Sequence, residues 1–422
     1  MPEGRSRLRE KSQARREEIL AAATRLFNRK SFAAVTFDAV ADEVGVTTGA
    51  LYHHFASKEV LVFECLSRGM ALYREELARA YEKGIDGLEL VRRFIRGRLK
   101  PGEPRMIVFS DINSLPKVHR EMLHLERNEN VEELANLIAM GIADGTIADR
   151  NPYLSSLAVF AVLDWMPFWY SENSYYTRQE AADAIDDLVT HGILVRDAPE
   201  PAAMCEPWDI DDAIAQLKPD SRRALRRERI LRIASHSFNQ YGMVGSSMEA
   251  IAQDAGLTRG AIYHHATDKM TLLRICLERA YRREGQLLDM VMAKVSTETD
   301  AIRRLIAEEV YIMRAMVALH GSEIGPKINF QNVAFLNADQ RHHLAALHEA
   351  VVGANRGRYA DGIAAGWFRK LDINFMQEVG AGMRNNLPTL FSMCGDKQAP
   401  DIADLCARLF LFGIKPRKSS KN

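Results

Sequence analysis

The sequence lacks the features that mark secreted, membrane-spanning and disulfide-stabilised proteins. Its five cysteines are odd in number and widely spaced, so we expect free thiols in a reducing compartment rather than a disulfide framework. It has no apolar run approaching about 18 residues, the length from which a membrane-spanning helix is considered. Residues 1–18 are basic but contain no apolar stretch, so they do not form a signal peptide pattern. These absences together predict a cytoplasmic protein without a membrane span.

The sequence also lacks the motifs of catalysis and cofactor binding. It has no Gly-rich phosphate loop, no GxSxG, no HExxH and no paired-cysteine motif. A group of three histidines followed by an acid invites a metal interpretation, but no Cys or His partner recurs at ligand spacing. This group consists of His342, His343, His348 and Glu349. We therefore predict that the protein is not an enzyme and has no catalytic residues, no metal site and no cofactor.

Net charge is absent as well, because 56 basic side chains balance 56 acidic ones. The basic residues are nevertheless unevenly distributed. Residues 1–30 hold nine Lys or Arg against four acids, and residues 218–232 hold seven against two. Such clusters are typical of surfaces that contact nucleic acid, with a solvated helix face as the ordinary alternative. No alternating strand pattern or βαβ rhythm occurs, which predicts an all-α fold.

What the sequence contains is an internal repeat. Residues 36–58 read TFDAVADEVGVTTGALYHHFASK, and residues 247–269 read SMEAIAQDAGLTRGAIYHHATDK. The register around these stretches holds over 53 aligned pairs, of which 21 are identical. At a second offset, GIADG at 141–145 aligns with GIAAG at 362–366. A whole unit of about 190 residues is therefore duplicated.

Each copy of the repeated stretch predicts two short helices joined by a tight turn. Thr36 suits an N-cap, and the apolar residues after it recur at helical spacing. Gly45 is placed to end the first helix, since glycine adopts the left-handed conformation at low cost. Thr47 then caps the second helix. This is the helix-turn-helix pattern, in which the second helix enters the DNA major groove.

These residues resemble the DNA-binding domain of the TetR family of transcriptional repressors. The resemblance runs from REEILAAATRLF to the LYHHF run and Lys58, and it recurs from RERILRIASHSF to IYHH and Lys269. It implies an all-α fold of two tandem units, each with a three-helix DNA-binding domain and a helical ligand-binding and dimerisation domain. The expected boundaries are 13–73 and 224–284 for the DNA-binding domains, 74–195 and 285–415 for the ligand and dimerisation domains, and 196–220 for a linker. We expect residues 1–12 to form an unstructured basic arm.

The motif predicts which residues contact DNA in both copies. Small residues at the start of the second helix allow close approach to base edges, and the Tyr, His and Lys beyond them reach phosphates. The predicted DNA-binding residues are Thr36, Thr47, Thr48, Gly49, Tyr52, His53 and Lys58 in the first copy, and Ser247, Thr258, Arg259, Gly260, Tyr263, His264 and Lys269 in the second. Arginine binds guanine through two donors, whereas threonine favours a thymine methyl or a phosphate. The difference between Thr48 and Arg259 therefore predicts unlike half-sites, and Ala266 in place of Phe55 predicts a looser second module.

Dimerisation in this family uses the last two helices of each unit, here about 153–170 with 179–194 and about 374–391 with 401–413. A tandem chain is able to form that four-helix contact within itself, so we interpret the protein as a single-chain pseudo-dimer. The rival arrangement is a homodimer of tandem chains with four DNA modules.

An aromatic run in the first unit is the candidate ligand pocket. Its residues are Trp165, Phe168, Trp169 and Tyr170. A stripe in the core or at the dimer interface is the alternative interpretation. The segment LAVFAVLDWMPFWY resembles the branch of the TetR family that senses acyl-CoA thioesters. In the second copy Asn386 and Leu390 stand at the two tryptophan positions, so the two pockets are predicted to differ.

These patterns predict a DNA-binding transcriptional regulator that acts as a ligand-released repressor. Its expected partners are double-stranded operator DNA and a small-molecule effector, such as an acyl-CoA or another hydrophobic metabolite. The alternative is a helical protein-interaction or architectural module, in which the second helix-turn-helix serves dimer-like assembly and does not read DNA. A helical enzyme would require a catalytic cluster that the sequence does not contain.

Overall fold

The computed structural model describes residues 3–417 apart from 101–111, 113–114, 171–175, 199, 202, 323, 327, 329–332, 334 and 395–398. Every regular element in this described part is a helix, so the prediction of an all-α fold is confirmed. An antiparallel bridge joins Leu194 to Phe368. No described helix has both the length and the apolar composition needed to cross a membrane.

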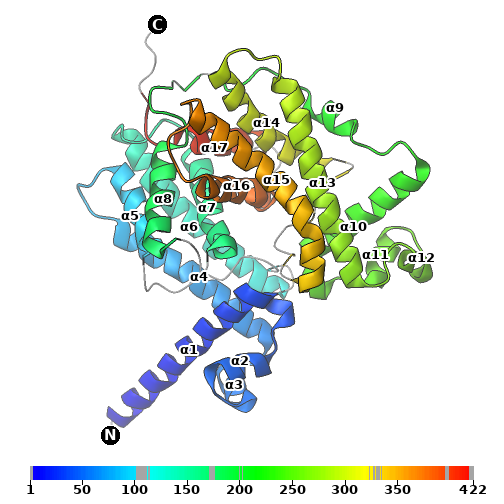
Figure 1. The fold of residues 1–422 in the computed structure, drawn as a ribbon. Coiled ribbons are helices and arrows are strands. Elements are labelled where there is room, and N and C mark those ends of the chain that lie inside the picture. Colours follow the sequence, from blue (N-terminus) through cyan, green and yellow to red (C-terminus); the bar gives the residue numbers. More distant parts are fainter. Residues whose placement is uncertain are drawn as a thin grey trace.

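The helices form two consecutive series that repeat the same order. The first series is α1 (Glu3–Ala34), α2 (Phe37–Val44), α3 (Thr48–His54), α4 (Lys58–Ala80), α5 (Gly87–Arg98), α6 (Lys117–Ala143), α7 (Pro152–Trp169) and α8 (Arg178–His191). After α9 (Ile210–Ala215), the second series is α10 (Arg222–Gly245), α11 (Met248–Asp254), α12 (Arg259–Tyr263), α13 (Lys269–Val295), α14 (Ala301–Gly321), α15 (Ala338–Ala364), α16 (Ile373–Cys394) and α17 (Ala399–Phe412). Figure 1 shows α2 and α3 at the bottom of the molecule and α11 and α12 at its right edge.

The first helix starts earlier than the sequence pattern predicted. Because α1 begins at Glu3, the expectation of an unstructured arm over residues 1–12 is wrong. Residues 3–12 are rich in Arg, Glu and Lys, which have high helix propensity, and they contain no proline and no glycine after Gly4. An ion pair between Arg15 and Glu18, at 2.5 Å, adds support one turn apart. In Figure 1 the N-terminal half of α1 projects away from the other helices.

The sequence repeat is preserved in side-chain contacts. The thiol of Cys65 donates to the carbonyl of Leu20, and the thiol of Cys276 donates to that of Leu231, both at 3.7 Å. Burial raises the pKa of both thiols to about 12, so they remain protonated packing groups. Ion pairs between the first and fourth helices also recur; they are Arg68 with Glu17 and Arg279 with Glu228. The first and fourth helices therefore pack against each other in the same way in both units.

Three hydrophobic cores are found among the described residues. One core fills the first predicted DNA module between α1, α2, α3 and α4 and includes the start of α6. A second core fills the other predicted DNA module between α10, α11, α12 and α13 and includes the start of α15. The third core is continuous through both helical domains, from α4–α8 to α13–α17. The two halves are thus joined by a common interior, whereas each DNA module packs separately.

Helices α7 and α16 form the centre of the contact between the halves, and their contacts are reciprocal. The side-chain amide of Asn386 donates to the carbonyl of Ala161 at 2.8 Å. In return Trp165 lies against Gly382, where an added Cβ would come within 2.9 Å of the Trp165 Cβ. Residues 165 and 386 are equivalent in the repeat, as are 161 and 382. Each helix therefore offers a small residue to the larger side chain of its partner.

The segments after α8 and α17 repeat this reciprocity in the backbone. The N–H of Ile193 donates to the carbonyl of Phe410, and the N–H of Ile414 donates to that of Val189, both at 2.9 Å. These four residues exchange places under the repeat offset that relates 192 to 413. An interface has twofold symmetry when a residue of the first unit contacts a residue of the second, and the equivalents of these two residues also contact each other across the interface. We name these α7–α16 and α8–α17 contacts the junction.

The segment 196–220 packs against both halves. The carboxylate of Glu200 contacts both Arg150 and Arg408 at 2.6 Å. The Tyr311 hydroxyl donates to the carbonyl of Glu206 at 2.6 Å, and α9 packs against α14. This segment therefore fixes the path between the two units.

Two glycines allow a test of the junction. Gly413 has φ +72°, and an added Cβ would lie 2.4 Å from the Thr190 carbonyl oxygen in the other half. Gly366 has a similar φ of +77° but nothing within 4 Å of the added Cβ. Both alanine substitutions incur the left-handed backbone penalty of about 1–2 kcal/mol. We expect Gly413→Ala to lower the free energy of unfolding by about 1–3 kcal/mol more than Gly366→Ala, because it also overpacks the junction. Urea denaturation measures the difference, and equal losses would contradict the junction packing.

Candidate DNA interface and effector site

The first helix-turn-helix is held by side-chain caps and one left-handed glycine. The Thr36 hydroxyl accepts from the N–H of Ala39 at 3.1 Å, and the Thr47 hydroxyl accepts from the N–H of Ala50 at 3.2 Å. Gly45 between the helices has φ +70°. The predicted caps of both short helices are therefore present. Because their hydroxyls are used locally, Thr36 and Thr47 define where the helices begin.

The second module repeats these caps with a shorter second helix. Ser247 and Thr258 accept backbone N–H groups at 3.1 and 3.3 Å. However, α12 has 5 residues where α3 has 7. Phe55 anchors the end of α3 in the core under the Arg16 guanidinium, 4.6 Å from the ring centroid. Ala266 is buried at the equivalent position but has no ring to offer.

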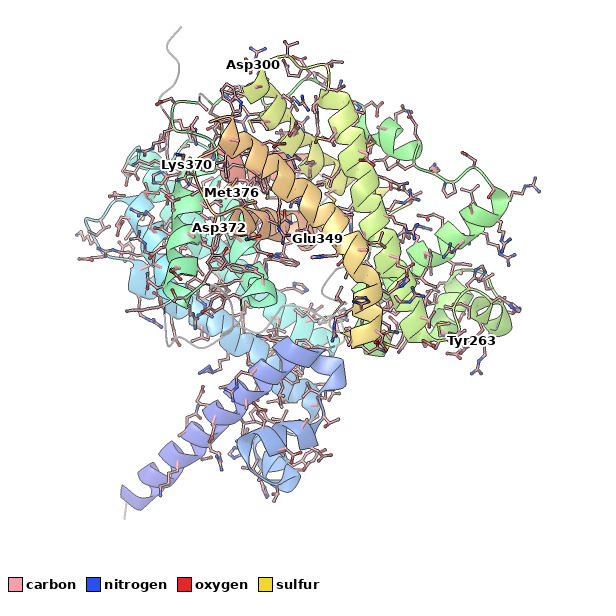
Figure 2. The ribbon with its side chains drawn as sticks, viewed as in Figure 1. Tyr263, Asp300, Glu349, Lys370, Asp372 and Met376 are labelled. Atoms are coloured by element: carbon pink, nitrogen blue, oxygen red, sulfur yellow. The ribbon has the colours of Figure 1, made fainter. Side chains whose placement is uncertain are left out.

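The predicted phosphate-contacting side chains are on the surface in both modules. Tyr52 and Tyr263 are 58% and 40% exposed, and His53 and His264 are exposed beside them. Figure 2 shows Tyr263 at the outer edge of the second module. Large aromatic side chains with this exposure are available to a partner.

The predicted glycines leave the surface of the second helix open. A Cβ added at Gly260 would meet nothing within 4 Å, and one added at Gly49 would meet only the Thr47 hydroxyl at 3.9 Å. The absence of side chains here lets another surface approach the helix backbone closely.

The two predicted lysines are less available than the tyrosines. Partial burial lowers the pKa of Lys58 and of Lys269. The ammonium of Lys269 donates to the carbonyl of Ser246 at 2.8 Å. Lys269 therefore stabilises the chain just before α11, in addition to any contact with DNA.

Two acidic residues that sequence reasoning missed contact the first residue of α3 and of α12. The Thr48 hydroxyl donates to Asp38 Oδ1 at 2.5 Å. At the equivalent positions, Arg259 Nε lies 2.9 Å from Glu249 Oε1. The available signal was that the repeat aligns an acid with an acid at 38 and 249.

The candidate pocket aromatics lie at the junction. Trp165 Nε1 donates to Glu378 Oε2 at 3.4 Å, across the two halves. The Trp169 ring packs edge-on against Phe375 of the second half, with centroids 5.4 Å apart. Tyr170 contacts Trp169 in turn, and the side chain of Phe168 is outside the described residues. The described members of this run thus contribute to the contact between halves.

A cavity of about 220 Å³ lies beside these rings. Its lining comes from both halves and consists of Tyr176, Glu180, Ala184, Leu188, Leu371, Asp372, Phe375 and Met376. The Tyr176 hydroxyl donates to Asp372 Oδ1 at 2.6 Å. Burial, and then this carboxylate, raise the pKa of Tyr176. Figure 2 shows Asp372 and Met376 near α8, where the halves meet.

Comparison with known families matches the helix-turn-helix region of both units and the helical domain of the first unit. A model of bacterial regulatory proteins of the tetR family matches residues 19–65 and again residues 230–275. A model of the tetracyclin repressor-like C-terminal domain matches residues 88–193. The first match covers both helix-turn-helix modules, and the second covers the first helical domain.

Comparison with individual proteins gives relatives of half this length. The HTH-type transcriptional repressor KstR2 of Rhodococcus jostii is 30% identical over 199 residues, which are 42% of this chain and 91% of that protein. KstR2 of Mycolicibacterium smegmatis is 25% identical over 191 residues, which are 43% and 91%. The solved structure of PfmR from Thermus thermophilus superposes with a TM-score of 0.36 and 26% identity, covering 40% of this chain and 95% of that one.

Each KstR2 protein is thus matched almost completely by less than half of this chain, as expected for a tandem duplication. The repeated helix-turn-helix, its caps and these matches agree. The chain belongs to the TetR family of DNA-binding transcriptional regulators, with two family units in tandem.

Proposed function

We propose that the protein is a ligand-responsive repressor that acts as its own dimer, so that the two modules of one chain bind two unlike half-sites. The reciprocal junction is the observation that carries this proposal. Helix-turn-helix proteins bind half-sites about one DNA turn apart, or a multiple of it, and therefore need a fixed relation between two modules. In this chain α7, α8, α16 and α17 pack together within one molecule. A covalent link also makes the contact independent of protein concentration.

On this proposal each segment of the chain has a distinct task. Segments 13–73 and 224–284 bind DNA, segments 74–195 and 285–415 form the ligand and dimerisation domains, and 196–220 links the units. The contacts to bases come from the start of α3 and α12, and those to phosphates from the exposed tyrosines and histidines. The two lysines add positive charge at the base of each module.

The effector is proposed to act at the junction. The cavity there is lined by both halves, so a ligand in it favours one arrangement of the halves over another. The resemblance of the α7 segment to acyl-CoA sensors supports a thioester. An apolar acyl group would enter the cavity, and the anionic CoA part would stay outside, away from Glu180 and Asp372. The KstR2 relatives are named repressors, which supports release of DNA as the response.

A second function is favoured by one observation, the degenerate end of α12. With Ala266 in place of the anchoring ring, the second module would serve only as a dimerisation partner. The chain itself offers a matched pair of substitutions that separates the two functions.

We expect Tyr52→Phe and Tyr263→Phe each to weaken operator binding about tenfold, because each removes one hydroxyl donor to a phosphate while keeping the ring. Fluorescence anisotropy with the full chain measures the affinity. A loss with Tyr52→Phe alone would assign DNA reading to the first module only and support the alternative.

The mass of the complex tests the pseudo-dimer. Light scattering of the protein with a promoter duplex should give one 47.5 kDa chain per duplex. Two chains per duplex would mean that the junction helices pair between chains, which would contradict the proposal.

The repeat also supplies a test of the effector cavity. Leu405 occupies the position equivalent to Ala184 in the second half. We expect Ala184→Leu to fill the cavity, so that the variant binds operator normally but is no longer released by an acyl-CoA that releases the wild type. Titration of the protein–DNA complex with acyl-CoAs of increasing chain length measures release. Release of the variant at the same concentration would exclude this cavity as the effector site.

A further inference from the structure

In both DNA modules an acidic residue contacts the first residue of the recognition helix, which is α3 in the first module and α12 in the second. In the first module the Thr48 hydroxyl donates to Asp38 at 2.5 Å, and in the second Arg259 forms an ion pair with Glu249 at 2.9 Å. The two pairs occupy equivalent positions of the repeat, since 38 aligns with 249 and 48 with 259. The same contact is therefore made twice with different chemistry.

The contact between Arg259 and Glu249 contributes little to stability. The side chains of Arg259 and Glu249 are 75% and 48% exposed, and exposed ion pairs contribute little to folding. Both acids lie in the first turn of their helices, where a negative charge also interacts favourably with the helix dipole. Loss of this helix-dipole interaction would lower stability but would not change which base the module prefers.

The contact in the second module orients a guanidinium for base recognition. Glu249 engages the Nε edge of Arg259, which leaves the two terminal nitrogens to donate together. Two parallel donors match guanine O6 and N7 in the major groove. The Glu249 carboxylate repels phosphates and acceptor-rich base edges. Its ion pair with Arg259 partly offsets this repulsion.

The contact in the first module has the opposite effect on its recognition residue. Because the Thr48 hydroxyl is committed to Asp38, the methyl group remains as its contact for a base. A methyl group is suited to the thymine methyl, and the second carboxylate oxygen of Asp38 is able to accept from the cytosine amine. The alternative of a phosphate contact by Thr48 is thereby disfavoured.

Resting on the proposed function of both modules, we propose that Asp38 and Glu249 are specificity-determining positioning residues. Each sets what its neighbour presents to the groove, so the Asp38–Thr48 and Glu249–Arg259 pairs read different bases. The two half-sites are unlike because the pairs differ.

The test uses the full chain and a DNA library with both half-sites randomised. We expect Glu249→Gln to lower the preference for guanine at one position of the second half-site about tenfold, while binding to non-specific DNA becomes tighter. Base preferences in the first half-site should stay unchanged in Glu249→Gln. In Asp38→Asn, base preference should change in the first half-site and stay unchanged in the second. Circular dichroism verifies that the variants are folded.

A pair exchange provides the complementary test. Asp38→Glu combined with Thr48→Arg gives the first module the pair of the second, so the selected sites should become symmetric at that position. Unchanged base preferences in Glu249→Gln, or the same selected sites in the exchange variant as in the wild type, would overturn the positioning role. Failure of the wild type to select any sequence would instead overturn the proposed function itself.

Discussion

The structure depends on the reciprocal packing of α7 against α16. Each DNA module has its own core, and the one interior common to both halves passes through the junction. The position of one recognition helix relative to the other is therefore determined where Trp165 meets Gly382 and Asn386 meets Ala161. A protein that binds two half-sites at fixed spacing requires such a relation, and on the proposed function one chain supplies it.

Joining two units in one chain permits differences that identical subunits do not allow. In a symmetric dimer a tryptophan at position 165 would appear on both sides of the contact. Here its counterpart is Asn386, and each of these side chains has a small partner across the junction. The same freedom extends to the DNA modules. Helix α3 is longer than its equivalent α12, and Thr48 corresponds to Arg259. Asymmetry is thus distributed over both the contact and the reading surfaces.

The sequence was sufficient for features that local chemistry determines. The caps at Thr36 and Thr47 and the left-handed Gly45 follow from side-chain and backbone preferences within a few residues. Contacts between separate helices were not accessible in this way. Asp38 meets Thr48 across the turn, and Trp165 meets Glu378 across 213 positions, and no periodicity encodes either distance. The α1 start was missed because charge was taken for disorder where helix propensity decides. The sequence did not predict how 196–220 packs, because its prolines and acids are equally typical of free linkers.

The route from the junction to the DNA modules follows from which helices belong to two cores. The start of α4 packs in the first DNA module and its end packs in the common interior, and α6 is divided in the same way. In the second unit α13 and α15 are shared between the corresponding cores. Two continuous helices per module transmit displacement without an intervening flexible loop, because close-packed interiors yield little. On the proposed function, a displacement at the junction would therefore move each module as a body, and an effector would act by altering the spacing of the recognition helices rather than their internal structure.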